Sequence, residues 1–223
     1  MLALLKVMLI IATCFAFTFL VIKTTGILSV EQIKHWLIIA KSSHQGYVFS
    51  IVVALLFADL FIAVPTLTII LLAGYFLGFH VALIASLMGM TLAGVVGYWL
   101  SSRYGEFVLK TIIKDKAERD KASSTFKQHG FVFILLSRAM PILPEVSACL
   151  AGITQMHFHR FFLAWVLSMA PYVAIASYAG SVSSISNPKP AIIAALGISG
   201  VLWCSWFFYH RYISKQQWPK QHL

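Results

Sequence analysis

The stretch Phe131–Met156, FVFILLSRAMPILPEVSACLAGITQM, places an arginine and two prolines inside an otherwise apolar run. As a helix, its first arm (residues 131–143) would be about 20 Å long, whereas the hydrocarbon core of a bilayer is about 30 Å thick. Because the residue before a proline disfavours the α conformation, the chain is expected to turn near Pro141 and Pro144. The stretch therefore predicts a re-entrant hairpin, which enters the membrane and returns to the same side.

A second helix is expected to begin at the second proline of this hairpin. Proline suits the first helical position, and Glu145 would then lie in the first turn, where the helix dipole favours negative charge. Interrupted backbone at membrane depth is stable only where protein or a water-filled cavity shields it. The polar tip should therefore line a cavity rather than face lipid. Its residues are Arg138, Pro141, Pro144 and Glu145.

The composition is that of an integral membrane protein. Hydrophobic residues make up 60% of the 223 residues, and charged residues only 11%. The net charge of +10 comes from 17 basic and 7 acidic residues. No basic stretch belongs to a recognised nucleic-acid motif, so basic cytoplasmic loops explain the charge better than a nucleic-acid partner.

The remaining chain divides into further apolar and amphipathic segments. We predict membrane spans at Leu2–Ile22, Phe79–Ser102, Phe158–Val182 (interrupted by Pro171) and Ala191–Tyr209. Ser29–Ser42 is expected to be an amphipathic helix at the membrane interface. Tyr47–Val64 and Thr66–Gly78 are too short for two spans and predict a second hairpin with its tip near Pro65. The charged segment Arg103–His129 contains the mixed run KDKAERDK (residues 114–121), which is expected to form a solvated helix face.

An internal repeat relates the two hairpins. When the chain is shifted by 79 residues against itself, Asp59 aligns with Arg138 and Pro65 aligns with Pro144. A shift of 78 residues aligns LLAG (Leu71–Gly74) with CLAG (Cys149–Gly152). Inverted repeats with discontinuous helices are typical of transporters. The predicted fold is therefore an all-α integral membrane protein. It has about four transmembrane helices, two re-entrant hairpins related by an inverted repeat, and interfacial amphipathic helices.

The distribution of basic residues predicts the orientation. The expected regions are 1–46 (first span and interfacial helix), 47–182 (the core with both hairpins) and 183–223 (last span and basic tail). With four crossings, the loop at 103–129 and the tail share one side and carry seven and three Lys or Arg residues, against four on the other side. Ten against four places both termini in the cytoplasm.

These residues resemble the DedA/VTT-domain family, also called SNARE-associated Golgi proteins, over about residues 47–182. The resemblance rests on Asp59 ahead of Pro65 and on Ser-Arg-x-x-Pro-x-x-Pro-Glu (Ser137–Glu145) followed by Leu-Ala-Gly. It implies a protein of the bacterial inner (plasma) membrane that moves lipids. The implied activity is that of a flippase or scramblase for a polyprenyl phosphate or a phospholipid, in some members linked to the proton gradient.

The candidate site residues fall into two groups, and each leading role has an alternative. Substrate binding is assigned to Arg138 with Pro141, Pro144 and Pro65, because an arginine fork beside helix N-termini suits a phosphate. Arg138 could instead extend to the interface or bind hairpin carbonyls. Proton coupling is assigned to Asp59 and Glu145, whose ionisation would depend on burial and nearby charge. Asp59 could instead be a counter-ion of Arg138, and Glu145 could stabilise a helix start.

Three function classes remain open, with lipid transport favoured over an assembly or homeostasis factor without transport and over an intramembrane lipid-modifying enzyme. His157 and His159 have no third ligand at suitable spacing, and no nucleophile motif is present. We therefore expect no catalytic residue, metal or cofactor. Trp165 is interpreted as an interface or packing residue. Membrane lipids and the phosphate-bearing substrate are the expected partners, with protons and a second copy of the chain left open.

Overall fold

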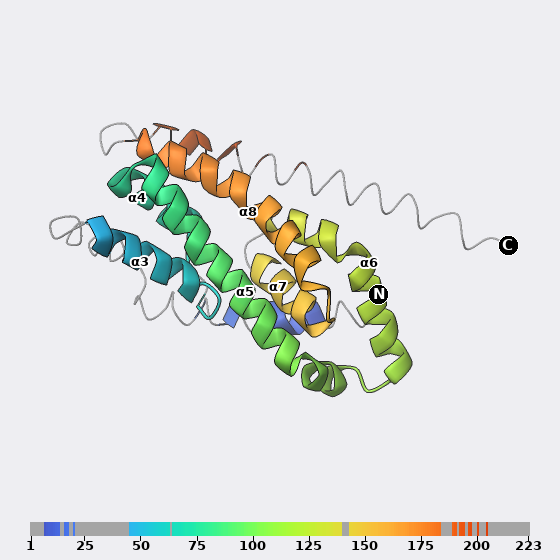
Figure 1. Ribbon diagram of the computed structural model, residues 1–223. Coiled ribbons are helices and arrows are strands. Elements are labelled where there is room, and N and C mark those ends of the chain that lie inside the picture. Colours follow the sequence, from blue (N-terminus) through green and yellow to red (C-terminus); the bar gives the residue numbers. More distant parts are fainter. Residues whose placement is uncertain are drawn as a thin grey trace.

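The computed structural model describes residues 7–13, 16–17, 20, 45–62, 64–139 and 143–183, and a few positions between 189 and 204. This described part is helical and contains no strand (Figure 1). Its main elements are α3 (Gln45–Ala58), α4 (Thr66–Leu77), α5 (Phe79–Ile112), α6 (Lys116–Leu136), the 3-10 turn η1 (Ser137–Ala139), α7 (Leu143–Ile153) and α8 (Phe158–Ser181).

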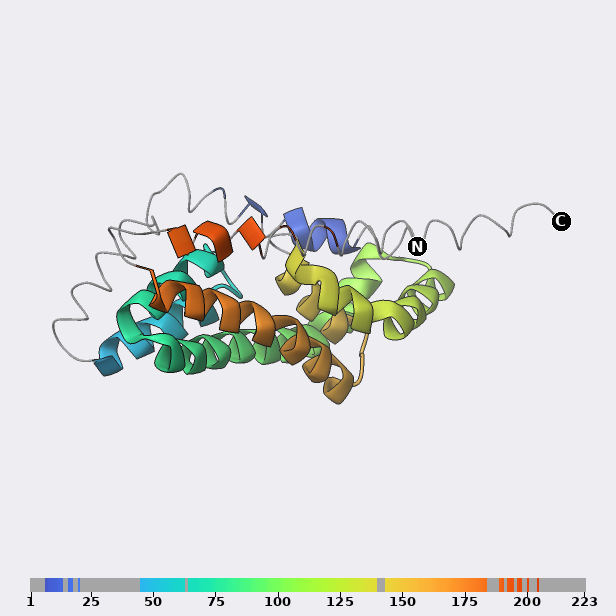
Figure 2. The same cartoon turned by 90° about the horizontal axis from the view of Figure 1, so that it is seen from above.

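Two of the described helices are long and apolar enough to cross a bilayer. They are Phe79–Gly105 within α5 and Phe158–Ser181, with mean hydropathies of 1.9 and 1.6. A span needs about 20 apolar residues, which both exceed. Figures 1 and 2 both show α8 running beside α5, and the two helices are in contact. They form the framework on which the shorter helices pack.

Three shorter apolar helices lie against this framework. α3, α4 and α7 have 14, 12 and 11 residues, so each is at most about 21 Å long and too short to cross alone. α3 and α7 pack on α5, whereas α4 packs on α8. Eight of the eleven residues of α7 are buried, so protein surrounds this short helix on most sides. Such shielding allows a chain to change direction at membrane depth.

Two glycines allow the short helices to approach the long ones closely. A Cβ atom on Gly74 of α4 would lie 2.9 Å from the amide nitrogen of Ser181 in α8. A Cβ atom on Gly152 of α7 would lie 2.8 Å from the amide nitrogen of Ser102 in α5. Both distances are too short for a real contact, so only glycine permits these backbone approaches.

Two boundary predictions are wrong. The helix that leads to Arg138 was expected to begin at Phe131, but α6 begins at Lys116 and continues without a break. Asp115 caps its start by accepting a hydrogen bond from the amide of Ala117 at 3.1 Å, and the charged turns then run directly into the apolar ones. The predicted interruption at Pro171 is also absent, because α8 continues through this exposed residue. Transmembrane helices tolerate proline where neighbouring groups satisfy the freed carbonyl.

Several predictions fall on residues that the structure does not describe. Most of the first span, the interfacial helix Ser29–Ser42, most of Ala191–Tyr209 and the residue Pro141 lie outside the described residues. The number of crossings and the division into three regions therefore stay predictions.

The close approach at Gly152 generates a test of the packing. Gly152→Ala should destabilise the protein by about 1–3 kcal/mol, because the added methyl group would overlap the backbone of α5. Gly46→Ala is the matched control, since nothing lies within 4 Å of a Cβ atom there. Thermal unfolding in detergent measures both variants. Equal melting temperatures for the two would contradict the close packing of α7 on α5.

Candidate functional site

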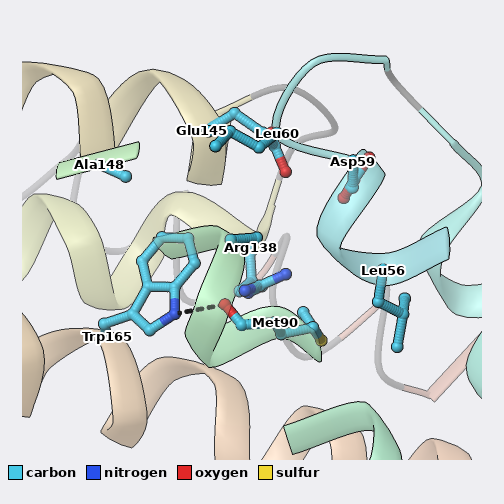
Figure 3. Close-up of a pocket in the computed structure, with 9 residues that line it drawn as sticks. Leu56, Asp59, Leu60, Met90, Arg138, Glu145, Ala148 and Trp165 are labelled. Carbon is cyan, nitrogen blue, oxygen red and sulfur yellow. Dashed lines mark hydrogen bonds between the residues drawn. The ribbon is translucent and has the colours of Figure 1, made fainter. Parts of the chain in front are cut away.

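Three of the residues singled out from the sequence lie around one cavity (Figure 3). Asp59 follows the end of α3, Arg138 lies in η1, and Glu145 lies in the first turn of α7. The other lining residues are Leu56, Leu60, Met90, Ala93, Ala148 and Trp165. The cavity volume is about 20 Å³, which is room for about one water molecule. The chain therefore brings three charged side chains together in largely apolar surroundings.

Asp59 stabilises the start of α4. Its side chain is only 8% exposed. One carboxylate oxygen accepts a hydrogen bond from the amide of Val64 at 3.0 Å, and the other accepts one from the hydroxyl of Thr66 at 2.9 Å. Pro65 has no N–H and forms no side-chain cap at the start of α4. The Asp59 carboxylate instead accepts the hydrogen bonds of the Val64 amide and the Thr66 hydroxyl there. Both oxygens of Asp59 are thus already used between the end of α3 and the start of α4.

Arg138 is held by aromatic rings. Its guanidinium carbon lies 5.2 Å from the centre of the Trp165 ring and 5.5 Å from that of Tyr172, both on α8. Its Nε and Nη2 atoms are buried and have no hydrogen-bond partner among the described residues. Figure 3 shows Arg138 between Trp165 and Asp59. No ion pair joins Arg138 to Asp59 or Glu145 within the described part of the chain, so the direct Asp59–Arg138 pair is not formed.

The three charges nevertheless act on one another through space. Asp59 and Glu145 are each within electrostatic range of Arg138 and of each other. Each carboxyl group thus lies close enough to influence the charge of the other. The arrangement therefore places one basic and two acidic side chains around the same cavity.

The prolines have positions at helix starts rather than in the cavity wall. Pro65 immediately precedes α4, and Pro144 is the second residue of α7. Neither is among the cavity-lining residues. Each fixes the direction in which its short helix leaves the break, which is a positioning role.

The sequence did not indicate that two aromatic residues lie beside Arg138, although Trp165 is buried as a packing residue should be. Trp165 was interpreted as an interface or packing residue, and Tyr172 was not considered. Their spacing of seven residues places both on one face of α8, which could have indicated a shared partner. Nothing in the spacing identifies Arg138 as that partner. Among the described residues, no group of three His, Cys, Asp or Glu side chains could hold a metal ion.

Comparison with known proteins connects this architecture to a family. The family model for the VTT domain matches residues 64–182, which is more than half of the chain. Undecaprenyl phosphate transporter A of Bacillus subtilis (strain 168) is 27% identical over 130 residues, covering 52% of this chain and 64% of that protein. The uncharacterized protein YqeD of the same organism is 28% identical over 116 residues, covering 45% of this chain and 56% of that protein.

The chain thus covers less than two thirds of the length of either relative. No solved structure matches it. The matched region includes α4 to α8 and contains Arg138, Glu145 and both aromatic residues that face the guanidinium. Taken with the two apolar helices, the match identifies a membrane protein, and the chain belongs to the DedA/VTT-domain family.

Proposed function

We propose that this protein is a flippase or scramblase, not an enzyme, and that it moves a phosphate-bearing lipid across the bilayer. The substrate would be a polyprenyl phosphate or a phospholipid, and Arg138 would bind its phosphate. The single observation that carries the proposal is a guanidinium in a membrane-protein cavity, two of whose buried nitrogens have no hydrogen-bond partner among the residues that the structure describes. The name of the 27% identical relative, an undecaprenyl phosphate transporter, is in agreement.

The energetics favour a phosphate as the missing partner. A buried donor without a partner costs about 1–3 kcal/mol, and more when the group is charged. A phosphate oxygen pair can accept two parallel hydrogen bonds from one guanidinium, which a single carbonyl cannot do. The cavity of about 20 Å³ is too small for such a headgroup, so the short helices must move apart when the lipid enters.

An inverted repeat supplies the basis for alternating access in this proposal. The repeat is supported by two corresponding contacts, in which the short helix α7 packs on α5 and the short helix α4 packs on α8. A Cβ atom on Gly152 would meet the Tyr98 carbonyl and the Ser102 amide, whereas one on Gly74 would meet the Ser177 carbonyl and the Ser181 amide. The partners differ by 79 positions in both cases, the shift that also relates Asp59 to Arg138. Two re-entrant hairpins would then rock around a shared cavity.

Proton coupling follows from the charge of the cavity. With both carboxyl groups ionised, Asp59, Glu145 and Arg138 give it a net charge of −1. An arriving phosphate adds further negative charge in surroundings of low dielectric constant, where repulsion is strong. Protonation of a carboxyl group would offset that charge. We therefore expect substrate binding to be accompanied by proton uptake at Asp59 or Glu145.

The first prediction concerns the phosphate-binding arginine. Arg138→Ala should abolish movement of a fluorescent polyprenyl phosphate in liposomes, and Arg138→Lys should remain at least about tenfold slower than the native protein because lysine lacks the planar fork. Arg160→Lys is the matched control, since Arg160 binds the carbonyls of Lys127 and Gln128 outside the cavity. Normal transport by Arg138→Lys would show that any positive charge suffices. Absence of transport by the native protein would favour an assembly factor.

The second prediction concerns the carboxyl pair. A pH gradient across the liposome should change the transport rate of the native protein but not that of Glu145→Gln, which can no longer carry a proton. Asp59→Asn is less informative, because Asp59 also stabilises the start of α4. A gradient response of Glu145→Gln equal to that of the native protein would exclude Glu145 from proton coupling.

The third prediction concerns orientation, which we propose from the distribution of basic residues. In a cysteine-free background, a membrane-impermeant thiol reagent added outside cells should label a cysteine at Asn187 but not one at Lys116. Lys116 lies in the basic segment that is expected to be cytoplasmic. Outside labelling at Lys116 would reverse the proposed orientation.

A further inference from the structure

Trp165 and Tyr172 contact Arg138 through their ring faces, although the proposed function gives them no role. Trp165 is only 4% exposed, and Tyr172 is partly buried. Their ring centres lie 5.2 and 5.5 Å from the guanidinium carbon of Arg138. Both residues come from α8, whereas Arg138 lies in η1. The guanidinium therefore meets two aromatic rings presented by one helix face.

The Trp165 ring is fixed in place by α5. Its indole Nε1 donates a hydrogen bond to the carbonyl oxygen of Met90 at 3.2 Å, as Figure 3 shows. One turn further along α5, Gly94 provides room for the ring, because a Cβ atom there would lie 2.7 Å from Cζ2 of the indole. Thus the hydrogen bond sets the orientation of the ring, and the glycine allows it to lie close to the helix.

An aromatic contact differs from an ion pair because it leaves the N–H donors of the guanidinium available for hydrogen bonds. A carboxylate partner would accept hydrogen bonds from the guanidinium and occupy its donors. An aromatic face attracts the cation without accepting those bonds. The carboxylate of Asp59 is already committed to Val64 and Thr66. Arg138 is consequently stabilised as a cation while its Nε and Nη2 donors stay without a partner among the described residues.

We propose that Trp165 and Tyr172 are positioning residues for phosphate recognition. Together they form an aromatic clamp that orients the Arg138 guanidinium and keeps its donors available for a phosphate group. This inference rests on the proposed function and adds the determinant of headgroup specificity to it. The clamp suits a flat, delocalised cation, which gives a second reason for arginine rather than lysine at this position.

Binding measurements on the purified full-length protein in detergent test the clamp. The probes are inorganic phosphate, a polyprenyl monophosphate and the corresponding uncharged polyprenyl alcohol. Trp165→Leu and Tyr172→Leu should each weaken binding of both phosphate probes about fivefold, with no change for the alcohol. Trp165→Phe keeps an aromatic face and should stay within about twofold of the native protein. Phe126→Leu is the control, since it removes a buried aromatic ring of α6 that packs edge to face against Phe133 rather than on Arg138.

The outcomes separate the clamp from the proposed function. Native affinity for both phosphate probes in Trp165→Leu and Tyr172→Leu, together with loss of binding in Arg138→Ala, would overturn the clamp and leave the phosphate site intact. Native affinity in Arg138→Ala would overturn the phosphate site itself. Weakened binding of the lipid but not of inorganic phosphate would also overturn the clamp, because the effect would then act through the lipid chain. If Trp165→Leu does not fold, Tyr172→Leu and Trp165→Phe still decide the question.

Discussion

A guanidinium held among apolar helices without a bound carboxylate is the constraint on which the rest of this structure depends. Removing a cation from water is costly, so the surroundings of Arg138 must compensate. They do so with two aromatic faces and with two nearby carboxyl groups that lie in range but do not form an ion pair with it. This arrangement stabilises the charge and leaves Nε and Nη2 without a hydrogen-bond partner among the described residues.

Asp59, the acidic residue that would most simply neutralise Arg138, is hydrogen-bonded to other groups. Asp59 uses both carboxylate oxygens to satisfy the turn before α4, where Pro65 contributes no N–H group. The turn between α3 and α4 thus depends on an acidic side chain for its backbone hydrogen bonding. The same carboxyl group lines the cavity together with Arg138 and Glu145. One side chain is therefore part of both the turn and the cavity.

Close packing of short helices on long ones brings these groups together. Gly74 and Gly152 allow α4 and α7 to approach α8 and α5 at backbone distance, and α7 then presents Glu145 to the cavity. Helices packed this closely adopt a few discrete arrangements and do not shift continuously between them. In the proposed function, the cavity of about 20 Å³ would have to widen before a lipid headgroup could enter.

The sequence by itself determined the membrane class, the breaks near Pro65 and Pro144, and the charged residues at those breaks. These properties are local, since hydropathy and the conformational limits of proline act over a few residues. It failed at the start of α6 and at Pro171, because helix length also depends on capping and on neighbouring helices. Only the tertiary structure decided that Asp59 binds the start of α4 and that Trp165 and Tyr172 face Arg138. The Asp59 hydrogen bonds span only five and seven residues, and they depend on the conformation of the turn between α3 and α4. The contacts of Trp165 and Tyr172 with Arg138 depend on how helices cross, and no pattern within a single segment identifies Arg138 as their partner.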